Sequence, residues 1–383
     1  MPSKRESSVV PSTNESINND DDALNVQQES DQEQNLFYTE VDELQMHGIG
    51  VADITKLKTA GICTVRGVQM MTKKALLKIK GLSETKVDKI KEAAIKSQGP
   101  GFVTAKEIAV QREKVVKIST GSKQLDVLLG GGIQTMSLTE VFGEYRTGKT
   151  QLAHTLCVQV QLSEEDGGAN SKAAYIDTEG TFRPDRVVSI ADRFGVDPEI
   201  VLDNIVVARA WNSDQQMDLI SELAAHFAEQ KGAYRLLVID SIISLFRCDY
   251  SGRGELADRQ QKLNQMLSRL TKISEEYNIA VFLTNQVSSD PGGSRYDICR
   301  RPKKASWWTC IGMLMRMCFH EYSKYAYTLL IFQLCRYYSS STRVYLRKGR
   351  GEERVAKLFD SPDMPESEAS YAINSGGIID IDF

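Results

Sequence analysis

The feature that most constrains this chain is the run Gly143–Thr150, which matches the pattern GxxxxGK[ST]. A strand-like apolar run ends directly before it at Phe142, and a helical stretch, 151–160, follows it. Glycines in such a loop let backbone amides wrap phosphate groups, and the helix N-terminus adds its dipole. This context favours a phosphate-binding loop over a chance turn. We expect Lys149 to reach the β- and γ-phosphates of a nucleotide and Thr150 to coordinate Mg²⁺.

From Val115 onward, short apolar runs rich in β-formers alternate with helical stretches. Such alternation is typical of a parallel α/β sheet. The expected strands are Leu138–Phe142, Ala173–Ile176, Ile205–Ala208, Leu236–Ile239 and Ala280–Leu283.

Three of these runs lead into a side chain that can act on a phosphate. Asp240 directly follows the run Leu236–Ile239, as in a Walker B segment, and would hold Mg²⁺ through water. Glu179 follows the run 173–176 and can orient or deprotonate an attacking water, while Gln286 could sense the γ-phosphate. Because α/β folds bind ligands at the carboxyl edge of the sheet, we expect these groups to converge there.

The part before the sheet divides by composition into a tail, a helical region and a linker. Residues 1–35 are acidic and polar, with too few large apolar groups to fold, and we expect them to be disordered. Residues 36–97 show helical spacing interrupted by the turns Gly48–Gly50 and Gly81–Ser83. Such turns present backbone N–H groups to a phosphate or are simple helix ends, and both readings stay open. The linker, 98–114, leads to the α/β region 115–383.

The composition limits the sites that the chain can carry. The 383 residues have a formal net charge of −4, so a DNA site would have to be a local basic patch. The seven cysteines include no CxxC pair, which argues against a zinc site or a disulfide framework. The N-terminus does not resemble a signal peptide, and the apolar run 326–334 is too short to cross a bilayer. We therefore expect a soluble protein of the cytosol or nucleus.

Three arginines follow the Asp240 strand in a loop punctuated by glycines. Arg247 and Arg253 lie in the loop, and Arg259 begins the helical run after it. This arrangement suits contacts to a nucleic-acid backbone. A solvated loop is the alternative.

Long runs of the chain resemble the eukaryotic RecA-family DNA strand-exchange recombinases. These runs are Gly143–Thr150, Tyr175–Arg186, Phe246–Gln265, Leu283–Gly293 and Leu346–Glu366. The run Met70–Ala93 is most similar to the meiotic (DMC-type) branch. The resemblance implies an α/β fold: a RecA-like P-loop ATPase core with a mainly parallel sheet, plus a small N-terminal all-α helix-hairpin-helix domain.

The resemblance also implies a DNA-dependent ATPase that uses ATP and Mg²⁺. Lys149, Glu179 and Gln286 would be catalytic, and Thr150 and Asp240 would hold the metal. Arg186 would stack on adenine, and the segment 360–365 would cap the nucleotide of the adjacent subunit. The implied nucleotide-binding residues are Gly143, Glu144, Tyr145, Arg146, Thr147, Gly148, Lys149, Thr150, Gln151, Arg186, Asp360 and Pro365.

Several partners follow from the same resemblance. The helical domain would bind duplex DNA, and Arg247, Arg253 and Arg259 would belong to the first DNA-binding loop on single-stranded DNA. Phe102 and Ala105 would form the FxxA anchor that plugs a neighbouring protomer and builds a helical filament or ring. The family also implies recombination mediators and accessory proteins, a nuclear location and no membrane partner.

The segment 294–341 departs from the family's pattern. In the family, the chain after Pro-Lys-Lys continues Pro-Ala-Gly-Gly-His-Val-Leu-Ala. In this chain, Lys304 is followed by Ala-Ser-Trp-Trp-Thr-Cys-Ile-Gly. One set of codons for this run, read one base later, encodes the family's run. We therefore hypothesise a frameshift or retained intron, with the frame restored by about Thr342; a genuine insertion is the alternative. The change should remove glycines of the second DNA loop, a histidine near the γ-phosphate and a core strand.

The sequence therefore predicts an ATP-dependent recombinase that forms filaments on single-stranded DNA and catalyses homologous pairing and strand exchange, in meiotic recombination and double-strand-break repair. Because of the altered segment, the alternative is an exchange-defective ATP- and DNA-binding variant or a regulatory paralogue. A RecA-fold ring motor such as a helicase is a further rival, since it shares the phosphate loop.

Overall fold

The computed structural model describes residues 38–98, 101–252, 254–286 and 341–381. The expected disordered tail, Arg253 and almost all of the altered segment 294–341 lie outside these ranges, as do residues 99–100 of the linker.

The N-terminal region is a small helical domain with its own apolar core. Its elements are η1 (Val41–His47), α2 (Val51–Thr59), α3 (Val65–Met70), α4 (Lys73–Leu76) and α5 (Glu84–Gln98). Val41, Leu44, Leu57 and Ile90 are among the residues that pack together in the core. Gly48 ends η1 in the left-handed conformation at φ +82°, which a glycine adopts without steric cost. Gly81, at φ +85°, makes the corresponding turn before α5.

A short helix, α6 (Ala105–Arg112), lies within the predicted linker. It begins with a capping box: the Thr104 side chain accepts from the Glu107 N–H, and the Glu107 side chain accepts from the Thr104 N–H. None of its residues is buried, and Phe102, just before it, is 98% exposed. The anchor segment is thus an exposed apolar residue beside a well-capped helix.

The C-terminal region is built on a nine-stranded sheet of order β11-β10-β9-β8-β3-β7-β6-β4-β5. The strands from β8 to β5 in this order are parallel, and β9, β10 and β11 continue the sheet in antiparallel fashion. The strands are β3 (Ser137–Gly143), β4 (Lys172–Asp177), β5 (Ile205–Arg209), β6 (Tyr234–Asp240), β7 (Ala280–Gln286), β8 (Thr342–Lys348), β9 (Arg354–Asp360), β10 (Glu368–Asn374) and β11 (Gly377–Ile379). A separate pair, β1 (Lys117–Ile118) and β2 (Ile133–Gln134), precedes it.

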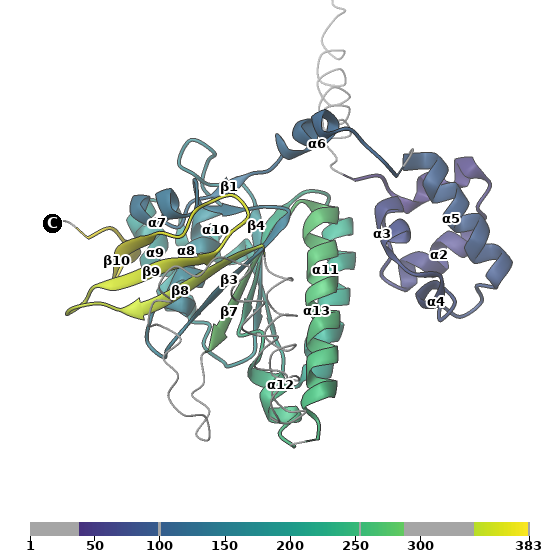
Figure 1. Cartoon of the computed structure of the whole chain (residues 1–383). Helices are drawn as coiled ribbons and strands as arrows, with labels where there is room; N and C mark the ends of the chain where they lie inside the picture. Colours follow the sequence, from purple (N-terminus) through teal and green to yellow (C-terminus); the bar gives the residue numbers. More distant parts are fainter. Residues whose placement is uncertain (1–37, 99–100, 253, 287–340, 382–383) are drawn as a thin grey trace, which may run out of the picture. The chain divides into compact units, whose positions relative to one another are not determined.

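Helices cover both faces of this sheet (Figure 1). On one face lie α7 (Lys123–Leu128), α8 (Lys149–Gln159), α9 (Pro184–Phe194) and α10 (Pro198–Asp203); on the other lie α11 (Ser213–Glu229), α12 (Ser244–Asp249) and α13 (Leu256–Tyr277). Successive strand residues enter opposite cores: Val238 packs in the first and Ile239 in the second. This two-sided burial explains why the central strands read as continuous apolar runs.

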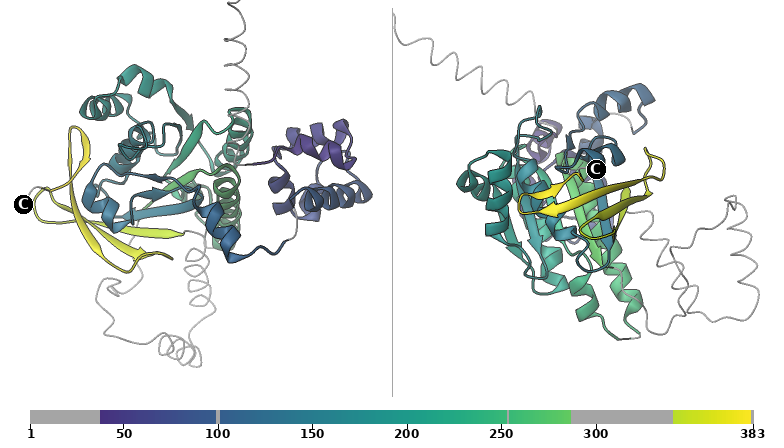
Figure 2. Two further views of the ribbon diagram at one scale, coloured as in Figure 1. Left: turned by 90° about the horizontal axis from the view of Figure 1, so that it is seen from above. Right: turned by 90° about the vertical axis from the view of Figure 1, so that its left-hand side faces the viewer.

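The last strands extend the sheet at one edge, as the yellow ribbons of Figure 2 show. β8 begins directly after the altered segment and pairs with β3, with Thr342 opposite Thr139 and Leu346 opposite Gly143. A strand therefore lies beside β3 directly after the altered segment. The core strand that we expected the altered segment itself to lose falls outside the described residues. Among the described residues, no helix combines the length and apolar character that crossing a membrane requires.

Candidate functional site

The phosphate-loop residues join β3 to α8 in a conformation that requires glycine at both ends. A Cβ on Gly143 would lie 2.3 Å from the backbone oxygen of Leu346, and one on Gly148 would lie 2.5 Å from Cδ1 of Ile373. Gly148 also has φ +99° and begins α8 without a side-chain cap. The first N–H groups of α8 thus lack a capping side chain, as an anion site at a helix N-terminus requires.

Lys149 is the first residue of α8, and its ammonium group folds back onto the loop. Its Nζ donates to the carbonyl oxygens of Gly143 at 3.0 Å and Glu144 at 2.7 Å. Burial lowers the pKa of Lys149, while the nearby charges of Asp240 and Glu179 oppose that shift. A partly desolvated cation held mainly by carbonyl dipoles would gain from an anionic partner, so Lys149 fits a phosphate ligand.

Asp240 ends β6 and is surrounded by hydroxyl donors from three other elements. Its Oδ2 accepts from Thr150 Oγ1 at 2.7 Å and from the Tyr175 hydroxyl at 3.0 Å, and Thr284 donates to Oδ1. The described residues include no cluster of three His, Cys, Asp or Glu that could hold a metal ion alone. One carboxylate with one hydroxyl suits Mg²⁺, which keeps most of its ligands as water and phosphate oxygens. Thr150 and Asp240 therefore fit the metal role predicted for them.

Glu179 lies just beyond β4 and contacts Gln286 directly. Its Oε1 accepts from Gln286 Nε2 at 2.8 Å and from Ser241 Oγ at 2.8 Å. The structure thus joins the acid predicted to act on water to the amide predicted to sense the γ-phosphate. Both lie at the carboxyl edge, where β3, β7, β6 and β4 are neighbours.

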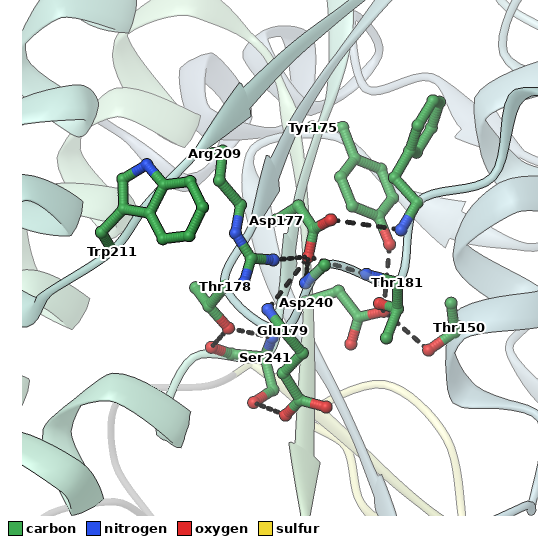
Figure 3. Close-up of polar contacts among 12 residues, drawn as sticks. Thr150, Tyr175, Asp177, Thr178, Glu179, Thr181, Arg209, Trp211, Asp240 and Ser241 are labelled. Atoms are coloured by element: carbon green, nitrogen blue, oxygen red, sulfur yellow. Dashed lines mark hydrogen bonds and ion pairs between the residues drawn. The ribbon is translucent and has the colours of Figure 1, made fainter.

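Asp177, the last residue of β4, organises the turn that carries Glu179 (Figure 3). Its Oδ1 accepts from the backbone N–H groups of Glu179, Gly180 and Thr181 at 2.7–3.2 Å, and Oδ2 accepts from Phe182 N–H at 3.2 Å. Arg209 Nη1 donates to Oδ1 at 2.9 Å. Five donors thus surround this carboxylate, which commits Asp177 to holding the turn, although it lies opposite Asp240 in the sheet.

Arg186, predicted to stack on adenine, lies on α9 and bonds to Gln151 of α8. Its Nε donates to Gln151 Oε1 at 2.6 Å, and its terminal nitrogens donate to the backbone oxygens of Asn374 and Ser375. Burial lowers the pKa of Arg186. Three hydrogen bonds thus fix the guanidinium of Arg186, whose helix packs beside α8.

Within the rest of the loop, Thr147 is held and Tyr145 is not. The Tyr371 hydroxyl donates to the Thr147 backbone oxygen at 2.8 Å. Tyr145 is 79% exposed, with the Arg146 guanidinium 5.6 Å from its ring centroid, and Arg146 has φ +65°. The outer part of the loop is therefore accessible, whereas its ends are fixed.

Of the other predicted residues that the structure describes, the arginines lie near the site, whereas Asp360 and Pro365 are not joined to it. Arg247, in α12, donates to the backbone oxygen of Gln286 at 3.0 Å, so it lies beside the Glu179–Gln286 pair. Burial lowers the pKa of Arg247, and the nearby charge of Arg259, in α13, lowers it further. Asp360 ends β9 and the exposed Pro365 follows; within the described residues, no hydrogen bond or ion pair joins either to the phosphate loop.

Sequence reasoning missed the groups that hold the catalytic residues in place. Asp177, Tyr175, Ser241, Thr284 and Arg209 were not assigned roles. Asp177 lies two residues before Glu179, and a second acid so close to a strand end is a signal that could have been used. Arg209 carried no local signal, because its role depends on the pairing of β5 with β4.

Comparison with known proteins agrees with this architecture. The Rad51 family model matches residues 111–307 and 335–381, and a model described as a SAM-like helix-hairpin-helix tandem matches residues 42–96. The interruption after residue 307 falls inside the altered segment 294–341. The predicted RecA-like core with an N-terminal helix-hairpin-helix domain is confirmed.

Similar proteins extend over almost the whole chain. A human protein, "Meiotic recombination protein DMC1/LIM15 homolog", is 54% identical over 91% of this chain and 95% of its own length. "Meiotic recombination protein DLH1" of Candida albicans is 54% identical over 89% of this chain and 97% of its own. "Meiotic recombination protein DMC1 homolog B" of Oryza sativa subsp. japonica is 51% identical over 91% of this chain and 93% of its own length. The predicted similarity to the meiotic branch is confirmed, and the chain belongs to the Rad51 family.

Proposed function

We propose that this chain is an ATP-dependent DNA recombinase that acts in meiotic recombination, where it pairs single-stranded DNA with homologous duplex and exchanges the strands. The observation that carries this proposal is the convergence of Lys149, Thr150, Asp240, Glu179 and Gln286 at one sheet edge, in a chain whose relatives are named meiotic recombination proteins.

In the proposed ATPase reaction, each residue has a separate task. The loop amides and Lys149 bind the β- and γ-phosphates, and Thr150 and Asp240 hold Mg²⁺. When bound, Mg²⁺ neutralises charge that develops on the phosphate oxygens. Glu179 orients a water toward the γ-phosphorus and accepts its proton, while the bond to the leaving oxygen of ADP breaks. Gln286 links this acid to the strand that leads into the second predicted DNA loop.

We propose that DNA contacts reach the same site through Arg247. Its bond to the Gln286 backbone oxygen connects the first arginine loop to the end of β7. Arg253 and Arg259 would contact the phosphate backbone of single-stranded DNA, and the helix-hairpin-helix domain would contact duplex DNA. Occupation of the loop by DNA would thereby influence the position of Gln286 and hence of Glu179.

Self-assembly is proposed to use the exposed segment Phe102–Ala105. An eight-residue helix with no buried side chain, preceded by a 98% exposed phenylalanine, gains stability from packing against another surface. A neighbouring copy would take Phe102 and Ala105 to build the filament, and 360–365 would cap the neighbour's nucleotide. Mediator proteins and a nuclear location belong to the same proposal.

The test is a strand-exchange assay between single-stranded DNA and homologous duplex, with ATP and Mg²⁺. Lys149→Ala should weaken ATP binding by about 2 kcal/mol, or about 30-fold, because the phosphates lose a charged donor, and should abolish exchange. Lys172→Ala, at the start of β4 and so at the amino edge of the sheet, is the matched control. If Lys149→Ala exchanges DNA strands as efficiently as wild type, the ATPase proposal is refuted. Closed rings in place of continuous filaments on DNA would favour a ring motor.

The segment 294–341 calls for a separate experiment. The family match on both sides of it favours an active recombinase over a regulatory paralogue. A version with Pro-Ala-Gly-Gly-His-Val-Leu-Ala restored after Lys304 should exchange strands more efficiently than the chain as written. Sequencing the transcript across the region tests the frameshift or retained-intron hypothesis, which a clean in-frame message would exclude.

A further inference from the structure

We infer that the ion pair between Asp177 and Arg209 is a positioning device that fixes Glu179 for ATP hydrolysis. The inference rests on the proposed ATPase function and adds two residues to it. Neither residue touches the phosphate loop through any hydrogen bond or ion pair given by the described structure, so their effect would pass through the Glu179 turn.

The turn after β4 is wrapped around a single carboxylate. Four consecutive backbone N–H groups, from Glu179 to Phe182, point at Asp177 at 2.7–3.2 Å. The Asp177 residue is only 5% exposed. Hydrogen bonds to an ionised acceptor are stronger than those to a neutral one, so the charge on Asp177 is what holds the backbone of Glu179 in place.

Arg209 supplies the counter-charge from the neighbouring strand. It is the last residue of β5 and lies opposite Asp177 in the parallel register, with Nη1 2.9 Å from Oδ1. A Cβ on Gly180 would lie 3.1 Å from the same nitrogen, so glycine lets the guanidinium lie against the turn. On its other side the guanidinium carbon lies 5.1 Å from the ring centroid of Trp211, which limits its movement (Figure 3).

A positioned carboxylate matters because Asp177 has a second acid beside it. Asp240 lies opposite Asp177 on β6, where it is proposed to hold Mg²⁺. Two adjacent carboxylates repel each other unless each has its own cation. Arg209 neutralises Asp177 from the β5 side, which leaves Asp240 to face Thr150. Loss of Arg209 would therefore loosen the Glu179 turn without removing any phosphate or metal contact.

The experiment compares Arg209→Gln, Arg209→Lys and wild type in the full chain. In DNA-stimulated ATP hydrolysis, Arg209→Gln should lower kcat by about tenfold, since small displacements of a catalytic group reduce rate steeply. The KM for ATP should change less than about twofold, because the phosphate loop is intact. Arg209→Lys should recover most of the lost kcat, since it keeps the charge.

Hydrogen exchange provides a readout that needs no turnover. In Arg209→Gln the amides of 179–182 should exchange about tenfold faster, while those of α8 stay unchanged. Glu368→Gln, which neutralises one half of an exposed ion pair with Arg347 at 3.1 Å, is the control and should behave as wild type.

The inference would be overturned if the amides of the turn in Arg209→Gln exchanged hydrogen at the wild-type rate, or if this variant kept the wild-type kcat. So would a parallel fall in ATP affinity and melting temperature, which would mark a general structural defect. Absence of ATPase activity in the wild-type chain would instead count against the proposed function. The hydrogen-exchange measurement would still decide whether the Asp177–Arg209 pair positions the turn.

Discussion

At the scale of single residues, Glu179 is the group on which the proposed hydrolysis depends. Glu179→Gln keeps the size of the side chain but removes its ability to take a proton from water. We expect kcat for ATP to fall by about a hundredfold or more. ATP binding should be retained, because Lys149 and Thr150 make the phosphate and metal contacts. Steady-state hydrolysis and binding of a fluorescent ATP analogue test this, and a kcat within threefold of wild type would exclude Glu179 as the base.

His154 gives the molecule a pH-dependent stability. It lies buried between Tyr175 and Phe182, and its Nε2 accepts from the Arg183 N–H at 3.3 Å. Burial lowers the pKa of His154 to about 4, against 6.5 for a free histidine. The native state therefore favours the neutral ring, whose stabilisation is complete above pH 6.5 and is lost as the pH falls toward 4.

This shift predicts a loss of about 2 kcal/mol of stability between pH 7 and pH 5 from His154 alone. Urea denaturation of wild type and His154→Gln at the two pH values measures it. Between pH 7 and pH 5, the free energy of unfolding of His154→Gln should fall by about 2 kcal/mol less than that of wild type. Equal losses in the two proteins would show that His154 does not carry the effect.

The same scale shows where sequence reasoning stopped. Lys149, Thr150, Asp240, Glu179 and Gln286 were assigned roles from motif and strand position, and the structure places them at one edge. Asp177 and Arg209 could not be assigned in this way. The role of Asp177 depends on how the turn curls back over its carboxylate, and that of Arg209 depends on which strands are neighbours.

At the scale of elements, a buried polar group ties three strands together. Glu140 of β3 accepts from Asn285 Nδ2 of β7 at 2.6 Å and from Arg343 Nε of β8 at 2.9 Å. Glu140 and Asn285 are each 5% exposed, and the Arg343 guanidinium lies 5.0 Å from the Phe142 ring centroid. The two strands that flank residues 287–341 are thus joined to the same carboxylate.

Removing that carboxylate should be strongly destabilising. Glu140→Ala takes away the charge that faces Arg343 in a largely buried setting, and we expect a loss of about 3 kcal/mol in the free energy of unfolding. Glu140→Gln, which keeps an oxygen acceptor and the side-chain volume, should lose less. Chemical denaturation measures both, and a loss below about 1 kcal/mol for the alanine variant would contradict the argument.

The elements themselves were predicted unevenly. The five expected strands are present, and each is longer than its apolar run, because polar residues such as Asp177 and Asp240 still belong to the sheet. The strands β8 to β11 were not predicted. Buried, half-exposed and exposed residues are mixed along them without a regular period, and in β10 only Tyr371 is fully buried, so hydrophobic periodicity gives little signal.

At the scale of the whole molecule, assembly is expected to depend on one exposed side chain. Phe102→Glu places a charge where an apolar anchor is proposed to enter a neighbour, so it should leave the chain monomeric. Light scattering and electron microscopy with single-stranded DNA and ATP test this. Binding of an ATP analogue by the isolated subunit should be unchanged. Filaments that persist in the variant would show that other contacts build the assembly.

The pair formed by Asp177 and Arg209 also has an evolutionary consequence. The two positions lie 32 residues apart in sequence, yet each would be unfavourable without the other: a buried acid beside a second acid, or a guanidinium against a turn with no charge to meet. A substitution at one position is therefore expected to persist only with a compensating change at the other. Across related chains these two positions should vary jointly or not at all, and Gly180, which admits the guanidinium, should be retained with them.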